Sequence, residues 1–208
     1  MSKKSRKFTI EVSRLWKCIL ALGDSLTRGF QIHPEYRNPI YTPYTDYLQS
    51  RLLGSGKNVV VLNEGIDGDT TSGMLERFNR SVVPEKPDFV IIWAGINDIY
   101  AGVSINQICE NLKELFTRTI NIPSIPFLCS LSPAHSESRL NDKIKRLNHL
   151  IQKTCYEKKI IFIDLYEELS DKSGNLLQEY SSDGVHLSQM GYKIVAETIY
   201  RTLIDTLL

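Results

Sequence analysis

The chain alternates short apolar runs with longer stretches of helical periodicity, and this alternation constrains its fold more than any other feature. The apolar runs lie at 19–22, 59–62, 89–93, 127–131 and 160–163. The candidate helices lie at 42–53, 71–81, 104–120, 138–158 and 188–207. Short apolar runs that alternate with helices are typical of βαβ units. The sequence therefore predicts an α/β fold with a parallel sheet covered by helices on both faces.

Local signals at the start of two helices support this assignment. Thr42 places a capping hydroxyl before Pro43, which suits the first position of a helix. Ser104 and Gln107 have the spacing of a capping box, in which each residue satisfies a free backbone N–H of the other.

Length and composition fit one domain over 1–208, with 1–15 as a possible N-terminal arm. A chain of 208 residues with 42% hydrophobic residues can bury a full-sized core. The net charge of +1 does not favour nucleic acid as a partner. The basic start is not followed by the apolar segment of a signal peptide, and no stretch approaches the length of a transmembrane helix. We expect no membrane insertion.

The cysteines are scattered singly and form no C-x-x-C pair. They are Cys18, Cys109, Cys129 and Cys155. Two of them lie in apolar runs, where a free cysteine behaves as a small hydrophobic residue. We interpret all four as reduced thiols, which predicts a cytoplasmic protein.

A serine and a distant Asp-His pair have the composition of a nucleophilic site. Ser25 follows the first apolar run, at the sheet edge where open α/β sheets bind ligands. Far downstream, Asp183 and His186 lie three residues apart in a loop with Gly184. A serine hydroxyl attacks when a base takes its proton, and a carboxylate orients that base. We predict Ser25 as nucleophile, His186 as base and Asp183 as the orienting acid. The residues around Ser25 do not fit the G-x-S-x-G elbow of the α/β-hydrolases.

Acyl transfer also requires donors for the oxyanion of the tetrahedral intermediate. Gly68 lies in the loop 63–71, where a glycine lets a backbone N–H approach a substrate closely. Asn97 follows the most apolar run and offers a side-chain amide, and the N–H of Ser25 is the third candidate. Each loop alone is also consistent with ordinary turn chemistry. Both loops, however, fall at strand ends beside the serine.

These residues fall in four blocks that resemble the SGNH hydrolases, the GDSL family of esterases and lipases. In chain order the blocks are 23–26, 63–70, 95–98 and 183–187. The similarity spans roughly 16–207, and 68–73 is most similar to the compact bacterial thioesterase, arylesterase and lysophospholipase branch. The resemblance implies a flavodoxin-like three-layer α/β/α fold with a five-stranded parallel sheet. It also implies catalysis without a metal or cofactor, with Gly68 and Asn97 as oxyanion donors.

The segment 29–42 departs from the compact pattern, and we expect it to reshape the pocket together with the loops 99–103 and 132–136. The candidate substrate-binding residues are Asp24, Tyr36, Tyr41, Tyr100 and Pro133. Partly buried surface positions explain the tyrosines equally well. The favoured substrates are short-chain acyl esters, including O-acetyl groups on sugars. Lysophospholipids and acyl thioesters are the alternatives.

A non-catalytic binding module is the alternative functional class, because doubly wound sheets also bind flavin mononucleotide at this edge. Arg28, Phe30 and Ile32 stand where a flavin protein would carry a phosphate-binding loop rich in Ser, Thr and Gly, which disfavours this class. The sequence also lacks the P-loop motif of nucleoside triphosphatases. We therefore expect a serine hydrolase that acts on a small-molecule ester, with its oligomeric state left open.

Overall fold

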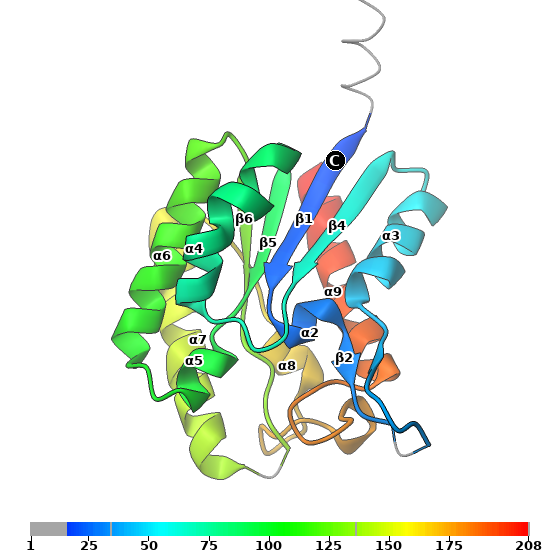
Figure 1. Ribbon diagram of the computed structural model, residues 1–208, viewed down its shortest axis with the longest axis vertical. Helices are drawn as coiled ribbons and strands as arrows, with labels where there is room; N and C mark the ends of the chain where they lie inside the picture. Colours follow the sequence, from blue (N-terminus) through cyan, green and yellow to red (C-terminus); the bar gives the residue numbers. More distant parts are fainter. Residues whose placement is uncertain (1–15, 34, 136, 208) are drawn as a thin grey trace, which may run out of the picture.

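A computed structural model of the protein describes residues 16–33, 35–135 and 137–207, so the predicted arm at 1–15 lies outside the described residues. One five-stranded sheet has the order β4-β1-β5-β6-β7, and all its pairings are parallel (Figure 1). Its strands are β1 (Lys17–Gly23), β4 (Val59–Gly65), β5 (Phe89–Trp93), β6 (Ile125–Cys129) and β7 (Ile161–Ile163). Counted along the chain this order is 2-1-3-4-5, that of flavodoxin-like folds. The predicted fold class is confirmed.

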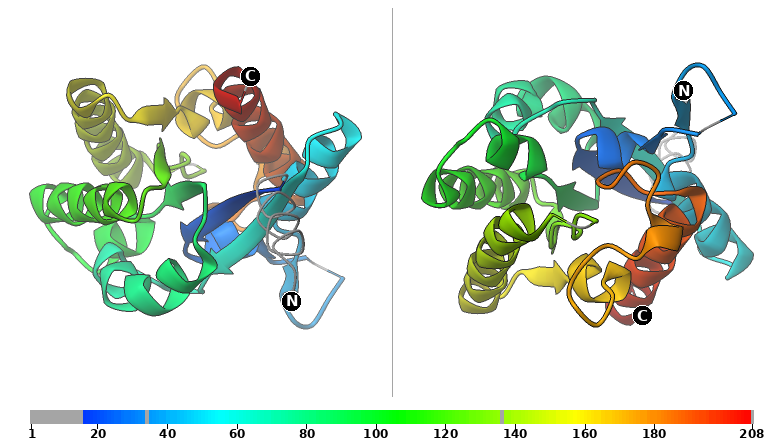
Figure 2. Two further views of the ribbon diagram at one scale, coloured as in Figure 1. Left: turned by 90° about the horizontal axis from the view of Figure 1, so that it is seen from above. Right: turned by 90° about the horizontal axis from the view of Figure 1, so that it is seen from below.

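Helices cover both faces of the sheet and complete the three layers (Figure 2). One face carries α3 (Tyr44–Gly54) and α9 (Gln189–Leu207), and the other carries α4 (Thr71–Ser81), α6 (Ile105–Asn121) and α7 (Ser138–Lys158). Because both faces are covered, all five residues of β5 are buried, and the strand reads as an uninterrupted apolar run. None of the described helices combines the length and apolarity needed to cross a membrane.

The predicted N-cap of α3 is wrong, and the predicted capping box of α6 forms only in part. Pro43, rather than Thr42, is the N-cap of α3, and the Thr42 hydroxyl accepts a hydrogen bond from the side chain of Gln31 instead. Ser104 does cap α6, since its Oγ accepts the N–H of Gln107 at 3.2 Å. The Gln107 side chain, however, donates forward along the helix to Asn111 at 3.0 Å.

The strand order reverses at β1, because β4 is added on one side of it and β5, the next strand in sequence, on the other. This arrangement opens a crevice at their carboxyl ends, the usual ligand position in such sheets. Short elements that the periodicity did not predict gather at or near this end (Figure 1). They are α2 (Ser25–Arg28), β2 (Phe30–Gln31), β3 (Ile40–Tyr41), α5 (Ile96–Tyr100), α8 (Leu165–Leu169) and η2 (Gln178–Tyr180). A further short turn, η1 (Val83–Glu85), precedes β5.

Candidate active site

Ser25 is the first residue of α2, which starts directly after β1. Asp24 caps this helix, because its Oδ1 accepts the N–H of Leu26 at 2.9 Å. The chain turns so tightly here that a Cβ atom on Gly23 would lie 2.0 Å from Oγ1 of Thr27. Glycine is therefore required before the Asp-Ser pair, and the tight turn fixes the position of the serine at the end of the strand.

The structure brings Ser25, His186 and Asp183 into one hydrogen-bonded line. Oγ of Ser25 lies 3.0 Å from Nε2 of His186, and Nδ1 of His186 lies 2.7 Å from Oδ2 of Asp183. Partial burial disfavours the charge on Asp183. The hydrogen bonds from the His186 ring and from the backbone N–H groups of Val185 and His186 outweigh it and lower the pKa of the carboxyl below its ordinary value. The carboxylate thus stays ionised and orients the imidazole toward the serine hydroxyl.

The loop that carries His186 is fixed from both of its sides. Within the loop, the N–H of Gly184 donates to Oγ of Ser181 at 2.7 Å, and the N–H of Ser182 donates to the carbonyl of His186 at 2.9 Å. From outside, the N–H of His135 donates to the carbonyl of Gly184 at 2.7 Å. These bonds restrain a segment that has no regular helix or strand of its own.

Phe30 packs against the imidazole of His186. The ring centroids of Phe30 and His186 are 4.5 Å apart, and the backbone carbonyl of Phe30 accepts the hydroxyl of the buried Tyr192 at 2.7 Å. The segment 29–42 therefore contacts the predicted base directly.

The three candidate oxyanion donors are the N–H of Ser25 itself, the N–H of Gly68 and the side-chain amide of Asn97. The N–H of Asp69 donates to the carbonyl of Ile66 at 3.1 Å, so Gly68 lies at the corner of a tight turn, with a φ of +75° that favours glycine. Within the described residues, the N–H groups of Ser25 and Gly68 donate no hydrogen bond to the protein. Nδ2 of Asn97 donates one hydrogen to the carbonyl of Asp69 at 2.9 Å, which leaves its second hydrogen for a ligand.

A cavity of about 220 Å³ opens over Ser25 and Asn97, and Gly68 is not among the residues that line it. It is lined by Ser25, Leu26, Ile96, Asn97, Tyr100, Asp183, Val185 and His186. Polar groups able to activate a hydroxyl and hold an oxyanion thus share one small cavity with aliphatic walls. Within the described residues, no group of three or more His, Cys, Asp or Glu side chains is arranged to hold a metal ion.

The model of the GDSL-like Lipase/Acylhydrolase family matches residues 21–194. The chain belongs to this GDSL family. The predicted resemblance is confirmed, and this GDSL hydrolase is a carboxylic ester hydrolase.

Individual relatives agree with this assignment. An arylesterase of Vibrio mimicus is 35% identical over 99 residues, which cover 48% of this chain and 46% of that protein. An acetylxylan esterase of Geobacillus stearothermophilus is 24% identical over 205 residues, which cover 89% and 93% of the two chains. The crystal structure of a lipase/acylhydrolase from Enterococcus faecalis superposes with a TM-score of 0.76 at 29% identity, over 91% of this chain and 96% of that one.

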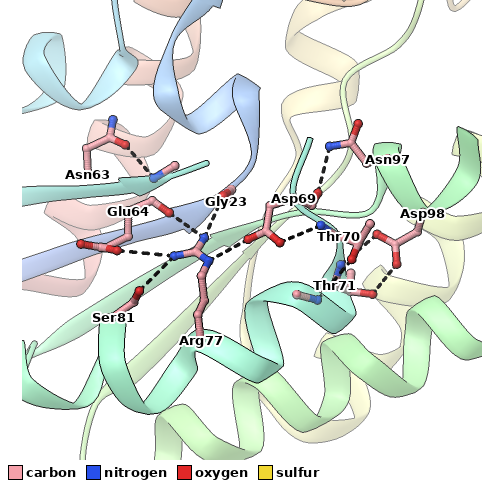
Figure 3. A network of polar contacts seen from close by, with 12 residues as sticks. Gly23, Asn63, Glu64, Asp69, Thr70, Thr71, Arg77, Ser81, Asn97 and Asp98 are labelled. Carbon is pink, nitrogen blue, oxygen red and sulfur yellow. Dashed lines mark hydrogen bonds and ion pairs between the residues drawn. The ribbon is translucent and has the colours of Figure 1, made fainter. Parts of the chain in front are cut away.

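A buried arginine connects the strand ends of this GDSL hydrolase with the loop 63–71, which carries the candidate donor Gly68 (Figure 3). The side chain of Arg77 on α4 is 3% exposed and pairs with Oδ2 of Asp69 at 2.7 Å. Its Nη2 donates to the carbonyls of Gly23 at 3.0 Å and Glu64 at 2.8 Å. One guanidinium thus joins the ends of β1 and β4 to the loop that carries Gly68.

Asp98, in the third block, fixes the start of α4 to α5 (Figure 3). The carboxylate of Asp98 is buried and accepts both the N–H of Thr71 at 2.9 Å and its hydroxyl at 2.6 Å. Asn111 on α6 donates to the same hydroxyl at 2.9 Å. The start of α4, directly after the second block, is therefore bound to the third block independently of Asn97.

The predicted substrate-binding residues occupy different places in this GDSL hydrolase. Tyr100 lines the cavity, whereas Pro133 is buried and is not among the lining residues. Tyr36 packs against His33 in a separate hollow, with ring centroids 4.9 Å apart. Tyr41 donates its hydroxyl to the carboxylate of Asp67, in the loop 63–71. Ser136, in the predicted loop 132–136, lies outside the described residues.

Asp24 is buried and is not among the residues that line the cavity. Its Oδ2 has no hydrogen-bond partner among the described residues. Burial raises the pKa of this carboxyl to about 7, although the N–H of Leu26 and the nearby His186 favour the charged form.

Sequence reasoning missed two residues that shape this site. In the sequence, Phe30 counted only against a flavin-binding loop, because a single phenylalanine has no catalytic signature. Arg77 lies between the buried Met74 and Phe78 on the inner side of α4. An arginine on the apolar face of a predicted helix was the available signal for a buried ion pair.

Proposed function

We propose that the protein hydrolyses short-chain carboxylic esters through an acyl-enzyme formed on Ser25. The observation that carries this proposal is the line from Oγ of Ser25 through the ring of His186 to Asp183, with separations of 3.0 and 2.7 Å, at the base of a cavity. A hydroxyl so placed loses its proton to the imidazole as it attacks a carbonyl carbon.

The proposed reaction has two halves that use the same groups. In the first, His186 takes the proton of Ser25 while the hydroxyl oxygen bonds to the ester carbonyl carbon, and Asp183 stabilises the imidazolium. The N–H groups of Ser25 and Gly68 and the amide of Asn97 hold the oxyanion. His186 then gives the proton to the leaving alcohol. In the second half, water attacks the acyl-enzyme in the same way and releases the acid and Ser25.

The size and lining of the cavity favour a short acyl group. Leu26, Ile96 and Val185 give it aliphatic walls within about 220 Å³, which suits an acetyl group or one a few carbons longer. An acetylxylan esterase aligns over most of this chain. O-acetyl groups on sugars are therefore the favoured natural class, ahead of lysophospholipids and acyl thioesters.

The test compares the wild type with Ser25→Ala on p-nitrophenyl esters of two to twelve carbons, on acetylated xylose oligomers and with a fluorophosphonate probe. We expect rapid labelling of the wild type, none of Ser25→Ala, and kcat/KM that falls with acyl length. Ser50→Ala, an exposed serine on α3, is the matched control and should keep full activity. A wild type that neither reacts with the probe nor cleaves any ester would favour the binding-module alternative.

A further inference from the structure

Three side chains from separate segments meet beside the oxyanion loop. Oδ2 of Asp67 accepts hydrogen bonds from Nη1 of Arg28 at 2.7 Å and from the hydroxyl of Tyr41 at 2.8 Å. The guanidinium carbon of Arg28 lies 4.6 Å from the centre of the Tyr41 ring. Each residue of this group, the Asp67 clamp, therefore contacts the other two.

Asp67 immediately precedes the candidate oxyanion donor. The turn closed by the bond from the N–H of Asp69 to the carbonyl of Ile66 has Asp67 and Gly68 as its two central residues. A positive φ at the second of these positions, +75° for Gly68, is what a type II turn requires. The peptide between the two central residues carries the N–H of Gly68, and it points in opposite directions in type I and type II turns. Anchoring the Asp67 side chain restrains that peptide.

The same clamp reaches the catalytic imidazole through the aromatic pair on the short hairpin. Tyr41 on β3 faces Phe30 on β2 in antiparallel register, with ring centroids 5.8 Å apart. Phe30 in turn contacts His186, with ring centroids 4.5 Å apart. Tyr41 thus connects the donor loop with the base.

The hairpin is itself fixed to the helix of the nucleophile. Gly29 ends α2 with a φ of +85°, and its carbonyl accepts the N–H of Thr42 at 2.9 Å. A Cβ atom at Gly29 would lie 2.3 Å from the backbone nitrogen of Pro43, so the two segments are in close contact. The hairpin that carries Tyr41 is therefore held against the helix that begins with Ser25.

Because the clamp is exposed, its effect on the geometry of the site can be distinguished from an effect on folding stability. The side chains of Arg28 and Asp67 are 49% and 34% exposed. Ion pairs this exposed contribute little to folding. The hydrogen bond to Asp67 raises the pKa of Tyr41 above its ordinary value, so the hydroxyl keeps its proton and remains a donor. A change in this clamp should alter the site much more than the fold.

We propose that Arg28, Tyr41 and Asp67 are positioning residues for ester hydrolysis. The clamp holds the N–H of Gly68 in the direction of the oxyanion and supports the ring of His186 through Phe30. This inference rests on the proposed function, because it takes Gly68 as an oxyanion donor. It also assigns a role to the segment 29–42, in which this chain departs from the compact pattern.

The test is Tyr41→Phe, which removes one hydroxyl and keeps the ring against Arg28 and Phe30. We expect kcat for p-nitrophenyl acetate to fall about tenfold, with KM changed less than about twofold, because the loss affects an interaction of the transition state. The inhibition constant of a short alkylboronic acid, whose adduct with Ser25 is tetrahedral, should rise by about the same factor. Asp67→Asn should have the same effect, and the double variant should lose less than the product of the two.

A matched control exists on α3 and α9, at residues that do not line the cavity of Ser25. Arg51 pairs with Glu197 at 3.1 Å and lies 4.2 Å from the ring centre of Tyr200, at similar exposure and away from the site. Glu197→Gln and Tyr200→Phe should keep wild-type kcat. Wild-type kcat in both Tyr41→Phe and Asp67→Asn, or a change in KM alone, would overturn the proposed positioning role of the clamp. Ser25→Ala assayed in parallel separates this outcome from failure of the proposed function, which would leave that variant active.

Discussion

The backbone carbonyl of Asp69 accepts a hydrogen bond from Nδ2 of Asn97 at 2.9 Å (Figure 3). This bond fixes the distance between the two loops that hold the candidate oxyanion donors. The side chain of Asp69 pairs with the buried Arg77 at 2.7 Å. The geometry in front of Ser25 therefore depends on a charged pair behind it, which is out of reach of any substrate.

Arg77→Met is expected to destabilise the protein strongly. It removes the guanidinium that pairs with the carboxylate of Asp69 and donates to the carbonyls of Gly23 and Glu64, and breaking such a buried pair costs about 3–5 kcal/mol. Urea unfolding followed by circular dichroism measures this loss. Arg80→Met, on an exposed position of the same helix, should remain within about 0.5 kcal/mol of the wild type. Equal stability of the two variants would contradict this account of the network.

Asp183→Asn is expected to lower kcat about 10³–10⁴-fold while the fold is retained. The Asn oxygen still accepts the N–H groups of Val185 and His186, but its amide donates to Nδ1 of His186 and places the ring proton on Nε2, where a base is needed. Steady-state kinetics with p-nitrophenyl acetate measures the effect. Asp171→Asn changes a carboxylate that accepts two backbone N–H groups in another loop, and it should be silent. A loss below tenfold for Asp183→Asn would remove this carboxylate from the mechanism.

The layers of the fold were predictable because each uses a local pattern. All five apolar runs became strands of one sheet, and the five periodic stretches became its main helices within a few residues. The short elements were not predictable, since α2 and α5 span four and five residues and arise from turns at strand ends. A stretch that short carries no usable periodicity.

The residues of the candidate site were likewise predictable only where they have a signature in the sequence. Ser25, Asp183 and His186 were identifiable because their chemistry has a residue signature, and the sheet edge explains why they meet. Tyr41 was interpreted as a substrate contact, yet its hydroxyl binds Asp67. That partner is 26 residues away, and the pairing depends on how a hairpin with two-residue strands lies against a turn. Local sequence contains no information on that placement.

Asp24→Asn is expected to change the pH dependence of stability. Between the ordinary pKa of 3.8 and the folded-state value of about 7, the folded protein holds a proton on Asp24 that the unfolded chain has released. The contribution of this group is therefore complete below the unfolded value and is lost as pH rises toward about 7, by about 4 kcal/mol at most. An Asn at this position is neutral throughout, so its stability relative to the wild type should increase from pH 5 to pH 8.

Thermal unfolding of both proteins across this pH range measures the difference. The exposed Asp46 on α3 provides the comparison, because Asp46→Asn should follow the wild-type curve at every pH. If the curves of Asp24→Asn and the wild type run parallel, the buried carboxyl does not titrate in this range.

Gly68→Ala tests whether the conformation of the turn at Gly68 matters for catalysis as well as for folding, because the chain offers a matched glycine. Gly68 and Gly102 have φ values of +75° and +76°, and a Cβ atom added at either would meet no atom within 4 Å. Each alanine therefore carries only the penalty of a left-handed backbone, about 1–2 kcal/mol. The two variants should lose similar stability in urea.

Their kinetics should differ. In Gly68→Ala the turn relieves its strain by rotating the peptide that carries the N–H of residue 68, and loss of one oxyanion donor costs about 10²–10³ in kcat. Gly102 lies in the loop before α6 and lines a different cavity from that of Ser25, so Gly102→Ala should keep wild-type kcat. Equal kcat in the two variants, at equal stability, would show that the N–H of Gly68 does not hold the oxyanion, and the donors would then reduce to Ser25 and Asn97.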